Sequence, residues 1–541
     1  MDNTIAASKG VSRTYQYGAR KPTNLTGDAY IIHKDQVNFW NRLVTIERDF
    51  LEHYRAVLHA ADPALAAEEA GVTALKTCLD RDRSQDRTEL RRRSIELAAR
   101  RKALRDAHAP QLAKLEETRR QTIKAARRDS HLWWPHYQTI LAEFDAARRK
   151  VFRQGGSLHA REFGDVIKFT VVFPKGLPVR DFIDGRAPTA LLSGQINADP
   201  GASRQRSQHH ASLLIAIDRV MVDERKGYRQ LQFPILFDRP LPDDGVIRSI
   251  TVRRDHIGTT PAWRAQFLLN LPPQAPLSDA PRGSACGVDL GWRMTDRGLR
   301  IACWAGSDGE KGEVLLPPRW IEKAKHLDSL RKRIASSSQA AATEVLTACR
   351  EQPTAESEVA IMTALCGYEK RSTRILERLH AIYGIGDTLS TAVSRLKQWW
   401  NEARRDINEA AHLGKHLADA RASIYQEAAL GLARQYGTIV IEGLNLARIA
   451  DLQERATSRA VRLAMKWAAI STFQHWVKHQ AAKHGATLRV EPSMDTTQEC
   501  AACGHINRQD TRNPILTCGR CGVMADQDEN AATNLMRAAE V

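Results

Sequence analysis

Long apolar runs and aromatic side chains are both scarce in this chain of 541 residues. No segment approaches the roughly 18 consecutive apolar residues that a membrane-spanning helix needs, and aromatic residues make up only 6% of the sequence. The N-terminal stretch Met1–Ala7 is polar and lacks the apolar core of a secretory signal. These absences predict a soluble cytoplasmic protein with no membrane partner.

Acidic residues are also in deficit, because 63 Asp and Glu face 80 Lys and Arg and leave a formal net charge of +17. Such an excess usually meets a polyanion; nucleic acid is the first expectation and an anionic membrane surface is the alternative. Residues 81–155 concentrate the excess, with 20 basic and 10 acidic side chains. Their runs could form a face that follows phosphates, or a solvated helix surface with i,i+4 ion pairs. The candidate nucleic-acid-binding residues are Arg91, Arg92, Arg93, Arg100, Arg101, Lys102, Arg119, Arg120, Arg127 and Arg128.

Cysteine is sparse except near the C-terminus. Four of the nine cysteines form two Cys-x-x-Cys knuckles, Cys500 with Cys503 and Cys518 with Cys521, separated by 14 residues. Four thiolates at this spacing suit a structural, tetrahedral Zn²⁺ ion with a closed coordination shell. Two disulfides or four buried thiols are the alternative, which a cytoplasmic location disfavours. We expect the other five cysteines to be reduced core residues: Cys78, Cys286, Cys303, Cys349 and Cys366.

Helical and β-rich blocks alternate along the chain, which indicates a multidomain α+β protein. Residues 36–155 have helical periodicity, and Tyr30–Ile32 before them could form a strand. The segments that follow are separated by turn signals and predict a small β-barrel, split from its first strand by the helical block. These β-rich segments are 162–174, 211–222, 228–237, 247–254 and 262–271. Further strands are expected at 285–293, 299–305, 312–316, 435–445 and 487–492, with helices over 318–430 and 458–484.

Three acidic residues stand out by their context. Asp289 lies in an apolar strand, Glu442 ends another, and Asp528 lies at the start of a final helix expected near Asn530. A charge on a buried strand costs several kcal/mol unless it is paired or bound to metal. If the two strands are adjacent in a mixed sheet and the helix packs over them, the carboxylates converge. Two Mg²⁺ ions about 4 Å apart could then activate a water and stabilise the leaving oxygen of a phosphodiester.

Simpler roles are open for the same residues. The carboxylates could lie at strand ends in water, where charge costs little. Asp526 and Asp528 could also cap the final helix, because Asp is a favoured N-cap residue.

The order of these motifs resembles the split RuvC nuclease of compact type V CRISPR effectors and of transposon-encoded TnpB nucleases. The motifs are Gly287-Val-Asp-Leu-Gly, Ile439-Val-Ile-Glu-Gly-Leu-Asn, the paired Cys-x-x-Cys knuckles and Asp528-x-Asn-Ala-Ala-x-Asn. Leu132-Trp-Trp before the predicted barrel and Asp289-Leu-Gly-Trp-Arg are most similar to subtype V-M.

The resemblance implies a bilobed protein in which a β-barrel wedge domain is interrupted by a helical recognition domain and followed by a split RNase H-like (RuvC) nuclease domain. The implied segments are wedge 1–35 and 156–280, recognition 36–155, RuvC 281–318, 426–495 and 525–541, a helical insertion 319–425 and a zinc-ribbon target-nucleic-acid-binding insertion 496–524.

The implied function is that of a CRISPR RNA-guided, Mg²⁺-dependent DNA endonuclease of the prokaryotic cytoplasm, acting as a monomer. It would bind a guide RNA and target double-stranded DNA and recognise a short flanking motif. Asp289, Glu442 and Asp528 would bind the metals, with Asp526 a near alternative to Asp528, and Arg508 or Arg512 would assist catalysis.

Three other functions remain open. Subtype V-M is associated with binding and silencing DNA with little or no cleavage. A TnpB-type transposon nuclease would share the chemistry, and an unguided zinc-ribbon DNA-binding protein or resolvase would need no RNA.

Overall fold

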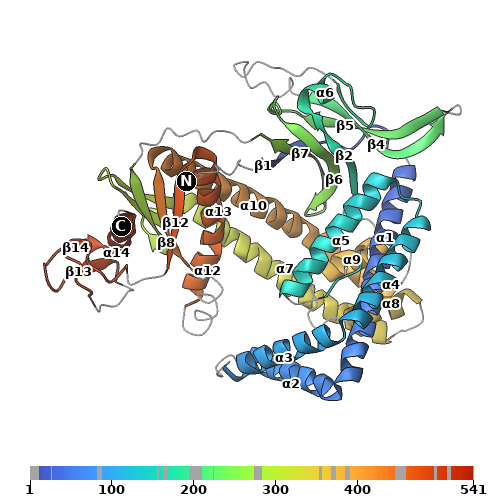
Figure 1. The fold of residues 1–541 in the computed structure, drawn as a ribbon, viewed down its shortest axis with the longest axis horizontal. Coiled ribbons are helices and arrows are strands. Elements are labelled where there is room, and N and C mark those ends of the chain that lie inside the picture. The colour runs from blue at the N-terminus through green and yellow to red at the C-terminus, as the bar shows by residue number, and fades with distance from the viewer. Residues whose placement is uncertain are drawn as a thin grey trace. The chain divides into compact units, whose positions relative to one another are not determined.

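The structure is a computed structural model, and its chain divides into two compact units. One comprises Met1–His256 with Pro261–Gln274, and the other Ile257–Thr260 with Ala275–Val541. The described residues are 11–25, 27–81, 88–154, 157–161, 167–193, 210–222, 225–272, 283–351, 356–366, 373–383, 390–444, 458–492, 496–507 and 513–539. Each unit carries helices and a sheet of its own (Figure 1), so the prediction of a multidomain α+β chain is confirmed.

The helical part of the first unit begins earlier than predicted. Its helices are α1 (Gly27–Ala61), α2 (Pro63–Arg81), α3 (Thr88–Ala107), α4 (Ala109–Arg128) and α5 (Trp134–Gln154). Tyr30–Ile32 lies within α1, so the prediction of a strand there is wrong. Ala29, His33, Val37 and Trp40 are buried at helical spacing along α1, and this packing overrides the β-propensity of a three-residue segment.

The β-rich segments of the first unit form one seven-stranded sheet in the order β2-β6-β7-β1-β5-β4-β3. Its strands are β1 (Val11–Ala19), β2 (Ile167–Pro178), β3 (Ala190–Ser193), β4 (His210–Val222), β5 (Arg225–Leu236), β6 (Val246–Ile257) and β7 (Thr260–Leu271), with the short helix α6 (Val179–Ile183). Strand β1 pairs with β5 and β7, which confirms that an N-terminal strand joins strands beyond the helices. The four-residue strand β3 and the five-residue helix α6 were not predicted, because segments this short show little periodicity in the sequence.

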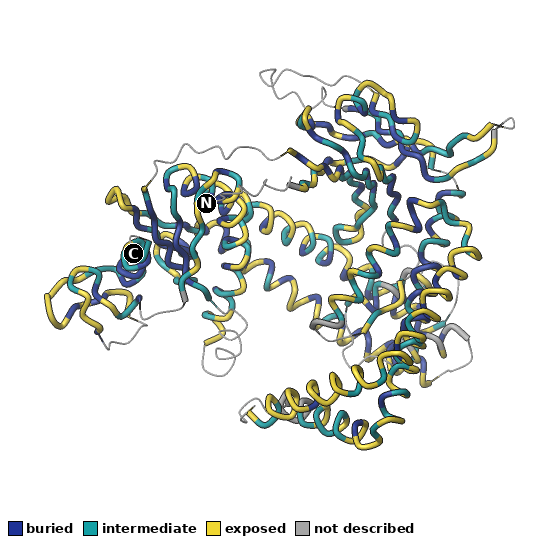
Figure 2. Tube along the Cα trace, viewed as in Figure 1, coloured by how far each residue is buried: buried dark blue, intermediate teal, exposed yellow. Residues whose placement is uncertain are grey.

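The second unit is built on a mixed five-stranded sheet in the order β10-β9-β8-β11-β12. Its strands are β8 (Ala285–Thr295), β9 (Gly298–Gly306), β10 (Lys311–Leu316), β11 (Thr438–Gly443) and β12 (Thr487–Pro492). The hairpin strands β8 to β10 are antiparallel, whereas β11 runs parallel to both β8 and β12. These strands agree with the predicted segments, and the buried residues of β8 and β9 show as dark blue in Figure 2.

Helices extend the core of this unit. Those that contact the sheet are α7 (Pro318–Glu351), α10 (Thr391–Gln435), α12 (Arg459–Ala468), α13 (Ile470–His484) and α14 (Gln527–Arg537), whereas α8 (Glu356–Cys366) and α9 (Thr373–Tyr383) pack on α7 and α10. The predicted helix over 458–484 is interrupted at Ala469, which has a left-handed φ of 42°. That conformation costs a non-glycine residue about 1–2 kcal/mol. The hydroxyl of Tyr425 donates a hydrogen bond to the carbonyl of Ala468 and helps to hold the break.

The scattered cysteines only partly match their prediction. Cys286, Cys303 and Cys349 are buried and reduced, as expected. Cys366 is reduced but exposed, so its assignment to the core is wrong. Burial of Cys78 falls outside what the structure describes.

Candidate functional site

Asp289 and Glu442 lie side by side on neighbouring strands. The parallel pairing of β8 with β11 places Val288 opposite Ile441. Asp289 follows Val288 and Glu442 follows Ile441, so the two acidic residues are neighbours across the strands. Asp289 is 5% exposed and Glu442 9% exposed. The prediction that these two carboxylates come from adjacent strands of a mixed sheet is therefore confirmed.

Helix α14 brings the third carboxylate over β8. A Cβ on Gly287 would lie 2.1 Å from the carbonyl oxygen of Ala532 and 2.2 Å from the backbone nitrogen of Met536. Only glycine allows the helix backbone to approach the strand this closely. Asp528, in the first turn of α14, consequently lies above the strand that carries Asp289.

The charges of Asp528 and Glu442 act on Asp289. Burial, together with the negative charges of Asp528 and Glu442, raises the pKa of Asp289 well above its ordinary value. Burial also raises the pKa of Asp528, although Arg293 and Arg300 act in the opposite direction. Like charges close together in a low-dielectric site disfavour ionisation, which a bound cation would relieve.

Two arginines compensate Asp528 from adjacent strands. Arg293 on β8 and Arg300 on β9 are cross-strand partners. Arg293 lies 3.1 Å from Oδ1 of Asp528, and Arg300 lies 3.0 Å from Oδ2. Sequence reasoning assigned neither residue a role: Arg293 ends the Asp289-Leu-Gly-Trp-Arg motif, and Arg300 does not belong to a run of basic residues.

Asp526 has a structural role that the sequence left open. It is the N-cap of α14, and its side chain accepts hydrogen bonds from the backbone N–H groups of Asp528 and Glu529. Burial opposes its ionisation, but the hydrogen bond from Arg300 lowers the pKa of Asp526. The helix begins at Gln527, three residues before the predicted start near Asn530. The cap interpretation is thus confirmed for Asp526, whereas Asp528 lies inside the first turn.

The donor types at the sheet suit Mg²⁺, which prefers carboxylate oxygens. Burial of several like charges on one face also fits a cation site. Among the described residues, however, one group of three or more His, Cys, Asp or Glu side chains has its ligand atoms all within 4.8 Å of one another. That group is the four knuckle cysteines. Both oxygens of Asp528 are engaged by guanidinium groups.

The knuckle thiols form a compact four-sulfur cluster. Sγ of Cys500 lies 3.7 Å from that of Cys521, and Sγ of Cys503 lies 3.6 Å from that of Cys518. A hydrogen bond from the backbone N–H of Cys521 lowers the pKa of Cys518 to about 6, which favours the thiolate that binds metal. Four thiols within this space fit a tetrahedral Zn²⁺ ion, and they leave no open position for substrate.

Two asparagines of α14 attach the knuckle to the helix. Asn530 accepts a hydrogen bond of 2.8 Å from the backbone N–H of Ala501 and donates one of 2.6 Å to the carbonyl of Glu499. Asn534 donates to the carbonyls of Thr496 and Glu499 at 2.9 and 2.8 Å. The two asparagines of the Asp-x-Asn-Ala-Ala-x-Asn motif therefore act as connectors and not as metal ligands.

A short hairpin completes this attachment. Strand β13 (Ile515–Thr517) pairs with β14 (Met524–Asp526), which leads directly into α14 (Figure 1). The backbone N–H of Gln527 donates to the carbonyl of Pro514 at 2.9 Å. The helix start that positions Asp528 is thus fixed to the cysteine-bearing segment. Arg508 and Arg512 lie outside the described residues, so their predicted role stays a prediction.

Most of the predicted nucleic-acid-binding arginines pair with acidic groups of the same unit. Arg92 and Arg93 pair with Glu89 at 2.8 and 2.6 Å. Arg119 is 8% exposed and lies between Glu47 and Glu116, so its assignment to an open phosphate-binding face is wrong. The other ion-paired members are Arg100 with Asp62 and Glu68, Arg101 with Glu69, and Arg120 with Glu116 and Glu117. The solvated, ion-paired alternative thus describes much of this surface.

The remaining members are better placed for an external partner. Arg127 lies over the ring of Tyr137 at 4.5 Å. Arg91, Lys102 and Arg128 are exposed and form no ion pair with another described residue.

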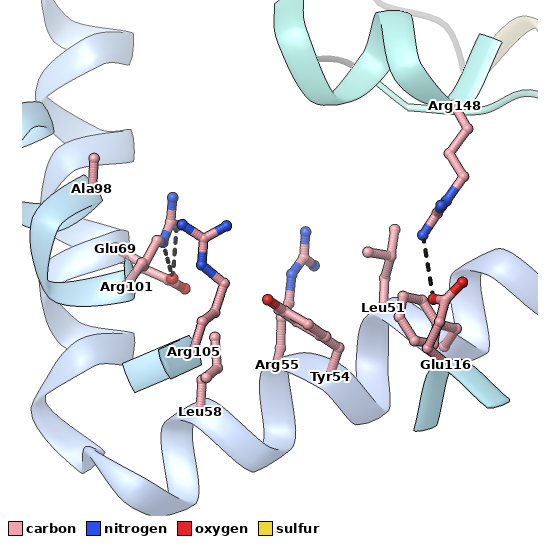
Figure 3. A pocket seen from close by; sticks show the side chains of 11 residues that line it. Leu51, Tyr54, Arg55, Leu58, Glu69, Ala98, Arg101, Arg105, Glu116 and Arg148 are labelled. Carbon is pink, nitrogen blue, oxygen red and sulfur yellow. Dashed lines mark hydrogen bonds and ion pairs between the residues drawn. The ribbon is translucent and has the colours of Figure 1, made fainter. Parts of the chain in front are cut away.

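A pocket of about 530 Å³ between α1, α3 and α5 contains further arginines (Figure 3). Arg101 and Arg148 are paired there with Glu69 and Glu116. Arg55 and Arg105 also line it, are exposed, and have no ion-pair partner among the residues that the structure describes. The sequence did not indicate them because each stands alone and not in a run.

Comparison with known proteins shows which chains this one resembles. A family model described as “Cas12f1-like, TNB domain” matches residues 471–535, which include the knuckles and most of α14. The CRISPR-associated DNA-binding protein Cas12m of Pelobacter propionicus is 27% identical over 95% of this chain and 85% of its own length. Cas12m of Allomeiothermus silvanus is 27% identical over 98% of this chain and 97% of its own length.

A Mycobacterium tuberculosis protein, named provisionally as an RNA-guided DNA endonuclease, is 29% identical over 28% of this chain and 32% of its own length. The predicted resemblance to compact type V CRISPR effectors is confirmed by these homologues. Among the described helices, none is both long and apolar enough to cross a membrane.

Proposed function

We propose that this chain is a CRISPR RNA-guided effector of the bacterial cytoplasm that binds target DNA and can cleave it with Mg²⁺. One observation carries the proposal: Asp289 and Glu442 lie on adjacent strands of a mixed sheet, and the charge of Asp528, on the helix packed over β8, acts on Asp289. The relatives that span most of the chain are named as CRISPR-associated DNA-binding proteins, which supports DNA as the target.

In this proposal the three carboxylates hold two Mg²⁺ ions, which supply an activated water and charge stabilisation for phosphodiester hydrolysis. The buried strands fix Asp289 and Glu442, and the glycine contact fixes the helix that carries Asp528. The Zn²⁺ ion is structural and orients the start of that helix through Asn530 and Asn534.

Nucleic-acid partners follow from charge and from the relatives. A guide RNA would supply sequence recognition, while the protein holds backbones and a short flanking duplex. Arg91, Lys102 and Arg128, together with Arg55 and Arg105, are the candidates for phosphate contacts because they are exposed and not neutralised by described acidic groups. We infer that residues 1–35 and 156–280 act as the wedge domain, 36–155 as the recognition domain and the second unit as a monomeric nuclease module.

A second function is favoured by a specific observation. Arg293 and Arg300 occupy both oxygens of Asp528, and the long relatives are named for DNA binding. An RNA-guided protein that silences its target with little cleavage would fit both facts. A TnpB-type role is less favoured, because the match to the provisionally named endonuclease covers only 28% of the chain.

Copurified RNA provides the test. RNA bound to the protein in its native host would be sequenced, and the reconstituted complex would be assayed on matched and mismatched duplex DNA with Mg²⁺. We expect guide-dependent DNA binding and cleavage that Asp289→Ala abolishes. Binding without product would select the silencing function, and the absence of a discrete RNA would overturn the proposal.

A further inference from the structure

We propose that Arg293 and Arg300 form a guanidinium clamp on Asp528 that lowers the affinity of the acidic site for divalent cations. The clamp would let the protein bind target DNA while the site is poorly loaded with metal. This inference rests on the proposed function, because it assigns a control on the same carboxylate site.

The clamp engages both oxygen atoms of one carboxylate. Arg293 lies 3.1 Å from Oδ1 of Asp528, and Arg300 lies 3.0 Å from Oδ2. A divalent cation that needs either oxygen must displace a charge-assisted hydrogen bond. Since each arginine takes a different oxygen, rotation of the Asp528 side chain does not free one of them.

Both arginines of the clamp also bind residues other than Asp528. Nε of Arg300 donates to Glu313 at 2.8 Å, and its Nη1 lies 2.9 Å from Asp526. Nη2 of Arg293 donates to the side-chain carbonyl of Gln527 at 2.9 Å. Arg300 is thus fixed by β10 and by the N-cap of α14, and Arg293 by the first residue of α14. The two arginine side chains therefore lose little conformational entropy when they bind Asp528.

Burial makes these contacts stronger than surface ion pairs. The side chain of Arg300 is 15% exposed and that of Asp528 is also 15% exposed. Ion pairs withdrawn from water are screened weakly by salt. Two fixed positive charges beside the acidic set also repel an incoming cation directly, in addition to blocking the oxygens.

The chain offers a matched control in the same hairpin. Arg297 pairs with Glu313, which also binds Arg300, but Arg297 is 68% exposed and is not a partner of Asp528 in the structure. Removing Arg297 therefore removes one positive charge near the site without opening the clamp.

The test measures Mn²⁺ binding to the full-length, zinc-loaded protein without nucleic acid, by electron paramagnetic resonance of unbound Mn²⁺. We expect R293Q and R300Q to bind Mn²⁺ at least about tenfold more tightly than the wild type, while R297Q is unchanged. Combining R293Q with Asp528→Asn should remove the gain. R300Q removes the guanidinium group that Glu313 and Asp526 share and could fail to fold, in which case R293Q decides.

Wild-type Mn²⁺ affinity in a folded R293Q protein would overturn the clamp, as would an equal gain in R297Q. Guide-dependent DNA binding would be measured in parallel on the wild type. Its absence would overturn the proposed function and leave the result on metal affinity standing, so the two failures are distinguishable.

Discussion

Gly287 of β8 and Ala532 of α14 lie so close that a Cβ on the glycine would be 2.1 Å from the alanine carbonyl oxygen. The contact is between backbones, so neither partner can yield by changing a rotamer. It determines where the first turn of α14, and with it Asp528, lies relative to the sheet.

Gly287→Ala should displace α14 and destabilise the second unit by roughly 1–3 kcal/mol, the usual cost of forcing extra atoms into a packed core. DNA cleavage should fall together with stability. Thermal unfolding and guide-dependent cleavage would be measured. Gly291→Ala on the same strand is the control, because a Cβ there meets nothing within 4 Å; equal effects of the two substitutions would contradict the argument.

Asp289→Asn should stabilise the protein in the absence of added Mg²⁺, by about 1–3 kcal/mol, because it removes a buried like charge. The pKa of Asp289 is raised in the folded state, first by burial. Wild-type stability therefore falls as pH rises from the ordinary carboxyl pKa through the raised one, and the advantage of Asn grows over that interval.

Thermal unfolding of the two proteins across pH would check this expectation. Cleavage should be lost in Asp289→Asn at every pH. Glu529→Gln, at an exposed position of α14, is the control and should show no such pH-dependent gain. A stabilisation of Asp289→Asn that is largest at low pH would contradict the sign of the argument.

Cys518→Ser should lower bound Zn²⁺, thermal stability and cleavage together, because the thiol belongs to a four-sulfur cluster. Cys366→Ser changes an exposed cysteine on α8 and should alter none of them. Zinc content by elemental analysis and unfolding temperature are the measurements. A stable, active Cys518→Ser protein would show that the metal is not structural. Asp528→Ala should instead abolish cleavage and retain zinc and the fold.

Asn530→Ala should uncouple the knuckle from α14. Asn530 exchanges hydrogen bonds with Ala501 and Glu499, and the substitution removes the acceptor of the part-buried Ala501 N–H, at about 1–3 kcal/mol, while Asn534 still donates to the carbonyl of Glu499. We expect lower stability with zinc content retained, which separates this variant from a cysteine variant. Thr533→Ala is the control, since the Thr533 hydroxyl bonds within its own helix, to the carbonyl of Glu529.

Arg55→Ala combined with Arg105→Ala should weaken guide RNA or target DNA binding and reduce its salt dependence by about one counterion for each lost phosphate contact. Binding would be measured over a range of salt concentrations. Arg92→Ala combined with Arg93→Ala removes the same charge from side chains already paired with Glu89 and should have the smaller effect. A larger loss of binding in the Arg92 and Arg93 double variant would show that the basic runs, and not the pocket, bind nucleic acid.

Local patterns in the sequence were sufficient for much of this molecule. The strands of Asp289 and Glu442 are apolar segments that each carry one of these acidic residues, and the four cysteines form two Cys-x-x-Cys knuckles. The helices from residue 318 to 435 follow from their periodicity. Such features depend on neighbours in sequence, so they could be predicted without coordinates.

Only the tertiary structure decided which charges meet. The basic runs predict a phosphate-binding face, but Arg119 lies between Glu47 and Glu116, and Glu47 is 72 residues away. Arg300 reaches Asp528 across 228 residues. The free energy of a charged side chain depends on its burial and on its partners in space. The sequence by itself determined the acidic residues and the thiols, whereas folding determined that two arginines hold one of those carboxylates.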